Sequence, residues 1–170
     1  ILIHRCVQRL SMTRIGAAVR RGGEWLEVVV RPRRFFRRTV QANDQAPAVY
    51  HIILLGAATA ALRLSVGPTE MTGMGGSTVL GTLVWIVVTA IFIAPVGLHL
   101  AAAVATVMLM MTAPDRAGIS MTVQVWAYAA TPVVLTGVGS PPLTVAALAL
   151  GAGLTVIGTA EVHALSPIRG

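Results

Sequence analysis

The hydrophobic and polar positions divide this chain into a polar, basic first quarter and a long apolar remainder. After residue 45 charged residues are rare, and the apolar stretches approach the length of about 20 helical residues that crosses a bilayer. The pattern predicts an all-α fold, an integral membrane helical bundle with spans at about 46–63, 78–111, 121–138 and 143–165. Residues 1–45 precede the bundle as a basic segment, and residues 166–170 follow it as a tail or as the start of a further span.

The stretch 78–111 is too long for an ordinary span, because at about 1.5 Å per residue it reaches roughly 50 Å as one helix. It is either a single helix bent near Pro95 or a hairpin that turns at 94–97. The second arm of a hairpin, 98–111, falls below the usual spanning length. A single span also returns Arg116 and Arg169 to the side of the basic segment, as the positive-inside rule requires. The sequence therefore favours one bent helix.

Small residues recur at a spacing of four in two of the predicted spans, which leaves a smooth strip where another helix can approach closely. The third span contains Pro132, which is expected to bend it. The predicted packing residues are Gly56 and Ala60 in the first span and Ala147, Gly151 and Thr155 in the fourth.

The basic segment carries ten of the thirteen arginines within the first 38 residues, and the chain has no lysine. Pro32 should interrupt a helix, so a short helix that lies in the membrane plane is expected to end near Val30. Aromatic rings at headgroup depth, with arginines reaching the phosphates, are typical of an interfacial anchor. A solvated basic linker is the alternative. The candidate anchor residues are Trp25, Arg31, Arg33, Arg34, Phe35, Phe36, Arg37 and Arg38.

The net charge of +7 first suggests nucleic acid as a partner. Because the arginines adjoin a hydrophobic span, anionic lipid headgroups are the nearer counter-charge, and lipid is favoured over nucleic acid. The same asymmetry predicts a multi-pass protein of the cell membrane with a cytoplasmic amino terminus. Contacts with other membrane proteins or with a second copy of the chain remain open.

Candidate catalytic chemistry is sparse. The chain has a single cysteine, and it lacks a His-Glu-x-x-His motif, a Gly-x-Ser-x-Gly motif and a phosphate-binding glycine loop followed by lysine. We therefore expect no enzymatic activity, no cofactor and no metal. His99 is the candidate polar site, because ionisable groups in spans are costly and often functional. The spans offer it no acidic partner except Glu161 near an end. This favours a neutral imidazole bonded to a carbonyl that the bend frees, or an imidazole that lies near the cytoplasmic interface.

Several stretches in order resemble the Yip1-domain family of membrane proteins, and in detail its haloarchaeal members. They read VRPRRFFR (30–37), DQAP (44–47), APVGLHL (94–100), and PDRAG (114–118) followed by TVQVWAYAATP (122–132). The resemblance covers about residues 24–165. It implies a bundle that usually has five spans and a cytoplasmic amino terminus, and it supports reading 78–111 as one span. Eukaryotic members act in vesicle trafficking and bind small GTPases.

The predicted function is a non-enzymatic, membrane-organising or scaffold role through lipid and protein contacts. Fold-level analogy alone does not carry the trafficking role over to this chain. The alternative is a small transporter or a subunit of a membrane transport complex, with His99 and the bends at Pro95 and Pro132 lining a path.

Overall fold

The computed structural model describes residues 25–66, 78–112 and 117–163, and all regular secondary structure in these ranges is helical. Four of its helices are long and apolar enough to cross a membrane, which confirms the predicted all-α fold. They are Ala46–Val66 (α3), Leu83–Thr112, Ile119–Val138 and Pro141–Val162 (α7). The start of the basic segment (1–24), Arg116, the end of the predicted fourth span (164–165) and the tail 166–170 lie outside the described residues.

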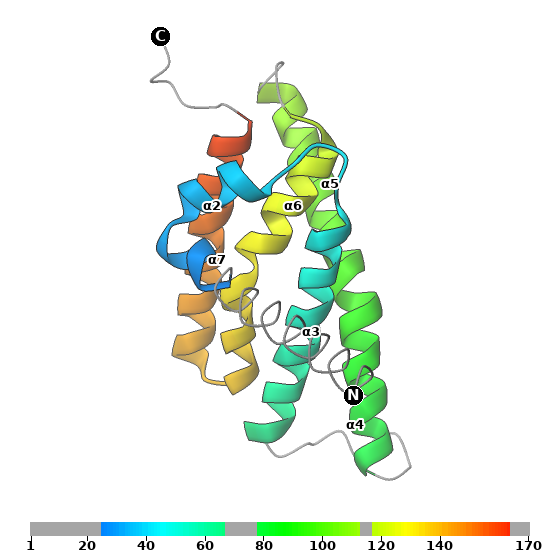
Figure 1. Ribbon diagram of the computed structural model, residues 1–170. Coiled ribbons are helices and arrows are strands. Elements are labelled where there is room, and N and C mark those ends of the chain that lie inside the picture. The colour runs from blue at the N-terminus through cyan, green and yellow to red at the C-terminus, as the bar shows by residue number, and fades with distance from the viewer. Residues whose placement is uncertain (1–24, 67–77, 113–116, 164–170) are drawn as a thin grey trace, which may run out of the picture.

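Successive spans run in opposite directions (Figure 1). The chain enters the bundle at the start of α3, and α7 ends at the same end of the bundle. A shorter helix, α2 (Pro32–Thr39), lies against α7 near this end. We call it the arginine end, because α2 carries Arg33, Arg34, Arg37 and Arg38. Within the described part of the basic segment, α2 is therefore folded onto the bundle.

The second span is a single continuous helix without a turn at 94–97. It consists of α4 (Thr78–Val88), a π-helical turn η1 (Thr89–Ile93) and α5 (Ala94–Thr112). Pro95 has no N–H group, and its ring crowds the carbonyl four residues earlier. The preceding turn widens, so that the Ala94 N–H donates to the carbonyl of Thr89, five residues back. The structure therefore contains the single long helix and not the hairpin.

The third span changes helix type at its proline. It begins as α6 (Ile119–Ala129) and continues as the 3-10 helix η2 (Thr131–Val138). Pro132 lies in the first turn of η2, where its missing N–H leaves no helical bond unmade. This span is the most buried of the four, with 56% of its central residues buried against 11–22% in the other three. The third span is therefore the centre around which the others pack.

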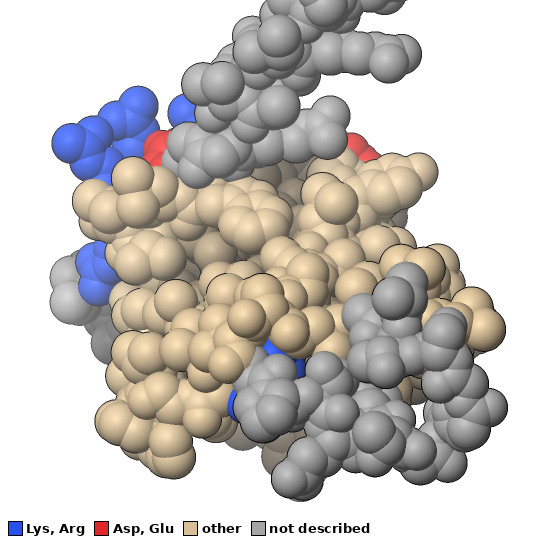
Figure 2. All heavy atoms as spheres, turned by 90° about the horizontal axis from the view of Figure 1, so that it is seen from below, with Lys and Arg blue, Asp and Glu red and all other residues tan. Residues whose placement is uncertain are grey.

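The outer surface of the bundle is apolar. Leu100, Val96 and Val156 are 66%, 65% and 69% exposed, and many other large aliphatic side chains share this position. Figure 2, seen from below, shows mostly uncharged surface, with basic side chains gathered mainly at one edge beside acidic ones. A soluble protein rarely exposes so much contiguous apolar area, whereas hydrocarbon solvates it without cost.

Gly56 allows the first and second spans to approach closely. A Cβ atom at this position would lie 3.1 Å from the Cβ of Ala94 and 3.2 Å from the Cα of Ala90, so α3 contacts the widened turn η1 almost backbone to backbone. Gly56 and Ala60, the small residues singled out in the first span, are both buried. The close contact explains why a glycine stands opposite the π-helical turn.

Gly56→Val should lower the free energy of unfolding by about 1–3 kcal/mol, the usual cost of forcing extra atoms into a packed contact. Gly153→Val is the matched control, because a Cβ at Gly153 meets nothing within 4 Å. The midpoint of thermal unfolding in neutral detergent, measured by circular dichroism, should fall for the first variant only. Equal shifts would contradict the close contact at Gly56.

Candidate functional site

The candidate site is built on two consecutive short helices. Residues 25–30 are helical, Arg31 is not, and α2 starts at Pro32. Proline disfavours a helical conformation in the residue before it and suits the first position of a helix. The φ and ψ of Arg31 are accordingly −135° and 60°. The first helix ends at Val30, as the sequence predicts, but Pro32 also begins a second helix that the sequence pattern did not reveal.

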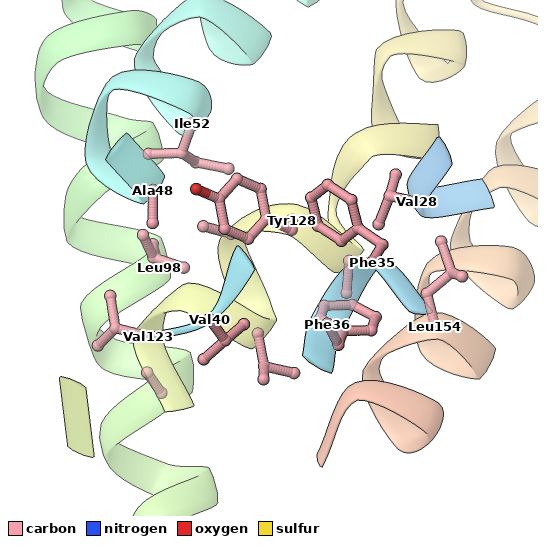
Figure 3. Packing of buried hydrophobic residues seen from close by; sticks show 14 of the residues in the cluster. Val28, Phe35, Phe36, Val40, Ala48, Ile52, Leu98, Val123, Tyr128 and Leu154 are labelled. Atoms are coloured by element: carbon pink, nitrogen blue, oxygen red, sulfur yellow. The ribbon is translucent and has the colours of Figure 1, made fainter. Parts of the chain in front are cut away.

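The helix α2 has one buried aromatic face and one exposed basic face. Phe35 is 2% exposed and Phe36 is not exposed at all. Figure 3 shows both rings pointing into the core cluster between Tyr128 and Leu154. The expectation that these rings contact lipid at headgroup depth is therefore wrong, because the bundle itself supplies their apolar surroundings. Burial of two such rings contributes several kcal/mol to holding α2 in place.

A chain of ring contacts continues from α2 through the bundle. The ring centroids are 5.6 Å apart for Phe35 and Phe36, 5.1 Å for Phe35 and Tyr128, 5.1 Å for Tyr128 and His51, and 4.9 Å for His51 and Trp25. Tilted and edge-to-face pairs of this kind are favourable beyond their buried area. Trp25, which was also expected to anchor in lipid, is half-buried and packs against His51.

Phe36 packs against the small residues of α7. A Cβ atom at Gly158 would lie only 2.9 Å from two atoms of the Phe36 ring. The buried residues of α7 are Ala147, Gly151, Leu154 and Gly158. Thr155, which was predicted as part of the packing strip, is half-buried, and its hydroxyl donates to the Gly151 carbonyl of its own helix at 2.9 Å. The buried face thus follows a spacing of four, three and four rather than a constant four.

Two glutamates pair with the basic face of α2. Glu161 of α7 lies 2.5 Å from Nε of Arg37 and 3.6 Å from Nε of Arg33. Glu27 lies 2.8 Å from an Nη atom of Arg38 and 3.8 Å from Nε of Arg34. The hydrogen bond to Glu161 and its negative charge raise the pKa of Arg37. Each carboxylate is thus shared by two arginines one turn apart.

Gln124 holds the segment between α2 and α3, a contact that the sequence pattern did not predict. Its side chain is 2% exposed. Its amide oxygen accepts from the Gln41 N–H at 3.0 Å, and its amide nitrogen donates to the Gln41 carbonyl at 2.6 Å. A single amide side chain within an apolar span was the sequence feature that could have indicated such a contact. Buried polar groups need such partners, so the pairing fixes where the basic segment joins the bundle.

His99 does not point into the interior of the bundle. Its side chain is exposed, and Nδ1–H donates to the carbonyl of Pro95 at 2.7 Å. The acceptor is the carbonyl four residues earlier in the same helix, and the exposed side chain lies away from any path through the bundle. Among the residues that the structure describes, no three histidine, cysteine or acidic side chains are grouped so that they could hold a metal ion.

His51, on α3, is a buried histidine that the sequence analysis did not single out. The Thr131 hydroxyl donates to the Tyr128 carbonyl at 2.6 Å, so its lone pairs are left to accept from Nε2–H of His51 at 3.1 Å. The bond therefore requires a proton on Nε2 of His51. His51 therefore positions the ring contacts with Trp25 and Tyr128.

The protein-family comparison matches the Yip1 domain over residues 26–170, and the chain belongs to this family. The match begins within the first of the two short helices, so the docked basic segment is part of the domain. Yip1 proteins are non-enzymatic, multi-pass membrane trafficking proteins, in agreement with the expectation that this chain is not an enzyme. No curated protein and no solved structure matches the chain.

Phe36→Ala should lower the free energy of unfolding by about 3–5 kcal/mol, because it removes a fully buried ring and leaves a cavity beside Gly158. Leu26→Ala is the control, since Leu26 is 66% exposed. Thermal unfolding in detergent and amide exchange over residues 32–39 measure the effect. Unchanged stability of the Phe36 variant would show that α2 is not docked.

Proposed function

We propose that this protein is a membrane-organising scaffold of the cell membrane, whose exposed arginines on the segment 31–38 bind anionic lipid headgroups of the cytoplasmic leaflet. Protein partners would be recruited to the same end of the bundle. The observation that carries the proposal is the division of α2 into a buried aromatic face and an exposed arginine face. The aromatic face holds the helix against α7, so the arginines stay at a fixed depth along the bundle, next to its apolar surface.

Charge at the arginine end supports an anionic partner. Five exposed arginines lie between Arg31 and Arg38, and four of them share the carboxylates of Glu27 and Glu161, so positive charge exceeds the internal counter-charge. Arginine suits phosphate in particular, because its planar guanidinium can donate two parallel hydrogen bonds. Lipid is the nearest source of phosphate for a helix that packs against a membrane-spanning one.

A cytoplasmic arginine end is supported by the positive-inside rule. α3 begins there, and α5 and α7 end there, so both ends of the four-span bundle share one side (Figure 1). Ten of the thirteen arginines precede α3. The exposed position of His99 offers no support for a transport path.

Replacing Arg33, Arg34, Arg37 and Arg38 together by Gln should abolish a preference for anionic lipid. The measurement is spin-label electron paramagnetic resonance on the full-length protein in bilayers, comparing the fraction of labelled phosphatidylglycerol and of labelled phosphatidylcholine held at its surface. The wild type should prefer the anionic lipid severalfold, at about 1 kcal/mol per exposed arginine near the membrane. The preference should weaken as salt is raised.

Arg63→Gln is the matched control, since Arg63 is an exposed arginine near the end of α3, at the other end of the bundle. It should keep the preference. Equal selectivity for the two lipids in the wild type would rule out the proposed lipid role.

A further inference from the structure

The four paired arginines of α2 differ in how tightly they hold their glutamates. Arg37 and Arg38 lie within hydrogen-bonding distance, at 2.5 Å from Glu161 and 2.8 Å from Glu27. For Arg33 and Arg34 the shortest nitrogen–oxygen distances are 3.6 Å and 3.8 Å, which are too long for a hydrogen bond. Of the α2 arginines, each glutamate thus has one tight partner in the second turn and one loose partner a turn earlier.

Burial of the carboxylates makes this difference important. The Glu161 side chain is only 13% exposed and that of Glu27 only 22% exposed, so water screens these charges poorly. A poorly hydrated carboxylate without a hydrogen-bonding partner is strongly unfavourable. Arg37 and Arg38 meet that requirement and are therefore not available to a ligand without a cost to the fold.

The loose partners are also the more exposed ones. The side chains of Arg33 and Arg34 are 74% and 65% exposed, against 59% and 57% for Arg37 and Arg38. Arg31, just ahead of α2, is exposed as well, and it takes part in none of the ion pairs found among the described residues. The three arginines follow one another closely in sequence at the start of α2, and none of them hydrogen-bonds a carboxylate among the described residues.

We infer that the arginines of this face have two separate roles. Arg37 and Arg38 fasten α2 to the bundle, whereas Arg31, Arg33 and Arg34 bind the phosphate of an anionic lipid. This division of roles rests on the proposed function and names the residues that perform it. The occupant is a lipid because the site is positively charged and because α2 packs on α7, whose outer surface is apolar, with Val156 69% exposed.

Two double variants of equal charge test the division of roles. Arg33→Gln with Arg34→Gln and Arg37→Gln with Arg38→Gln each remove two positive charges from the same helix. A uniform electrostatic attraction predicts the same loss of lipid preference for both. The division of roles predicts a large loss for the first pair, up to about fivefold per arginine at an anionic surface, and a much smaller loss for the second.

The stability of the fold should be affected more by the second pair of substitutions than by the first. The second pair should lower the midpoint of thermal unfolding and speed amide exchange over residues 32–39, because it leaves Glu161 and Glu27 without hydrogen bonds from these arginines. The first pair should leave both values near those of the wild type. Phe36 is unchanged in both variants, and its buried ring should keep α2 docked for the lipid measurement.

The outcomes separate the two proposals. Equal losses of lipid preference, or a larger loss for the second pair, would overturn the division of roles while leaving a lipid role intact. A wild type without anionic preference would overturn the proposed function together with the division of roles. Inorganic phosphate, added at constant ionic strength, should leave the preference for anionic lipid unchanged. If phosphate abolishes the preference, the site binds a soluble phosphate and the lipid assignment is overturned.

Discussion

The packing of Phe36 against Gly158 is the interaction on which the arrangement of the arginine end depends. The ring is completely buried, and the absence of a side chain at Gly158 is what gives it room. A helix with four arginines among its eight residues would otherwise have little reason to stay next to a membrane-spanning helix. Once the ring is buried, the helix has a fixed rotation, and that rotation decides which arginines meet a carboxylate and which face outward.

A second constraint comes from the prolines within the spans. The backbone groups that a proline leaves unpaired must find partners, because hydrocarbon offers none. The chain meets it in two ways. The turn before Pro95 widens to a π-helix, and Gly56 lets the first span pack directly against it. At Pro132 the third span begins a 3-10 segment, where the missing N–H is not needed. At both prolines the helix continues with an altered hydrogen-bond spacing instead of ending.

The sequence was sufficient to predict the coarse fold, because long apolar stretches and the arginine asymmetry follow directly from the cost of placing polar groups in a bilayer. It also distinguished the single long helix from a hairpin, since a hairpin arm would have been too short. The placement of Phe35 and Phe36 could not be derived in this way. Rings next to arginines fit lipid or protein equally well, and only the tertiary contact with Gly158 and Tyr128 decides between them. The amide of Gln124 bonds a backbone 83 residues away, a distance in sequence that no local pattern reveals.

The central claim is that residues 25–39 stay packed against α7 when the protein is in a lipid bilayer. The distance between this segment and α7 tests it most directly. Spin labels at Leu26 and Val156, both exposed, can be placed in a protein whose single cysteine, Cys6, has been replaced by serine. Double electron–electron resonance in nanodiscs should give one narrow distance distribution, because the segment is held by buried rings. A broad distribution would contradict the docked arrangement and would leave the segment as a free interfacial helix.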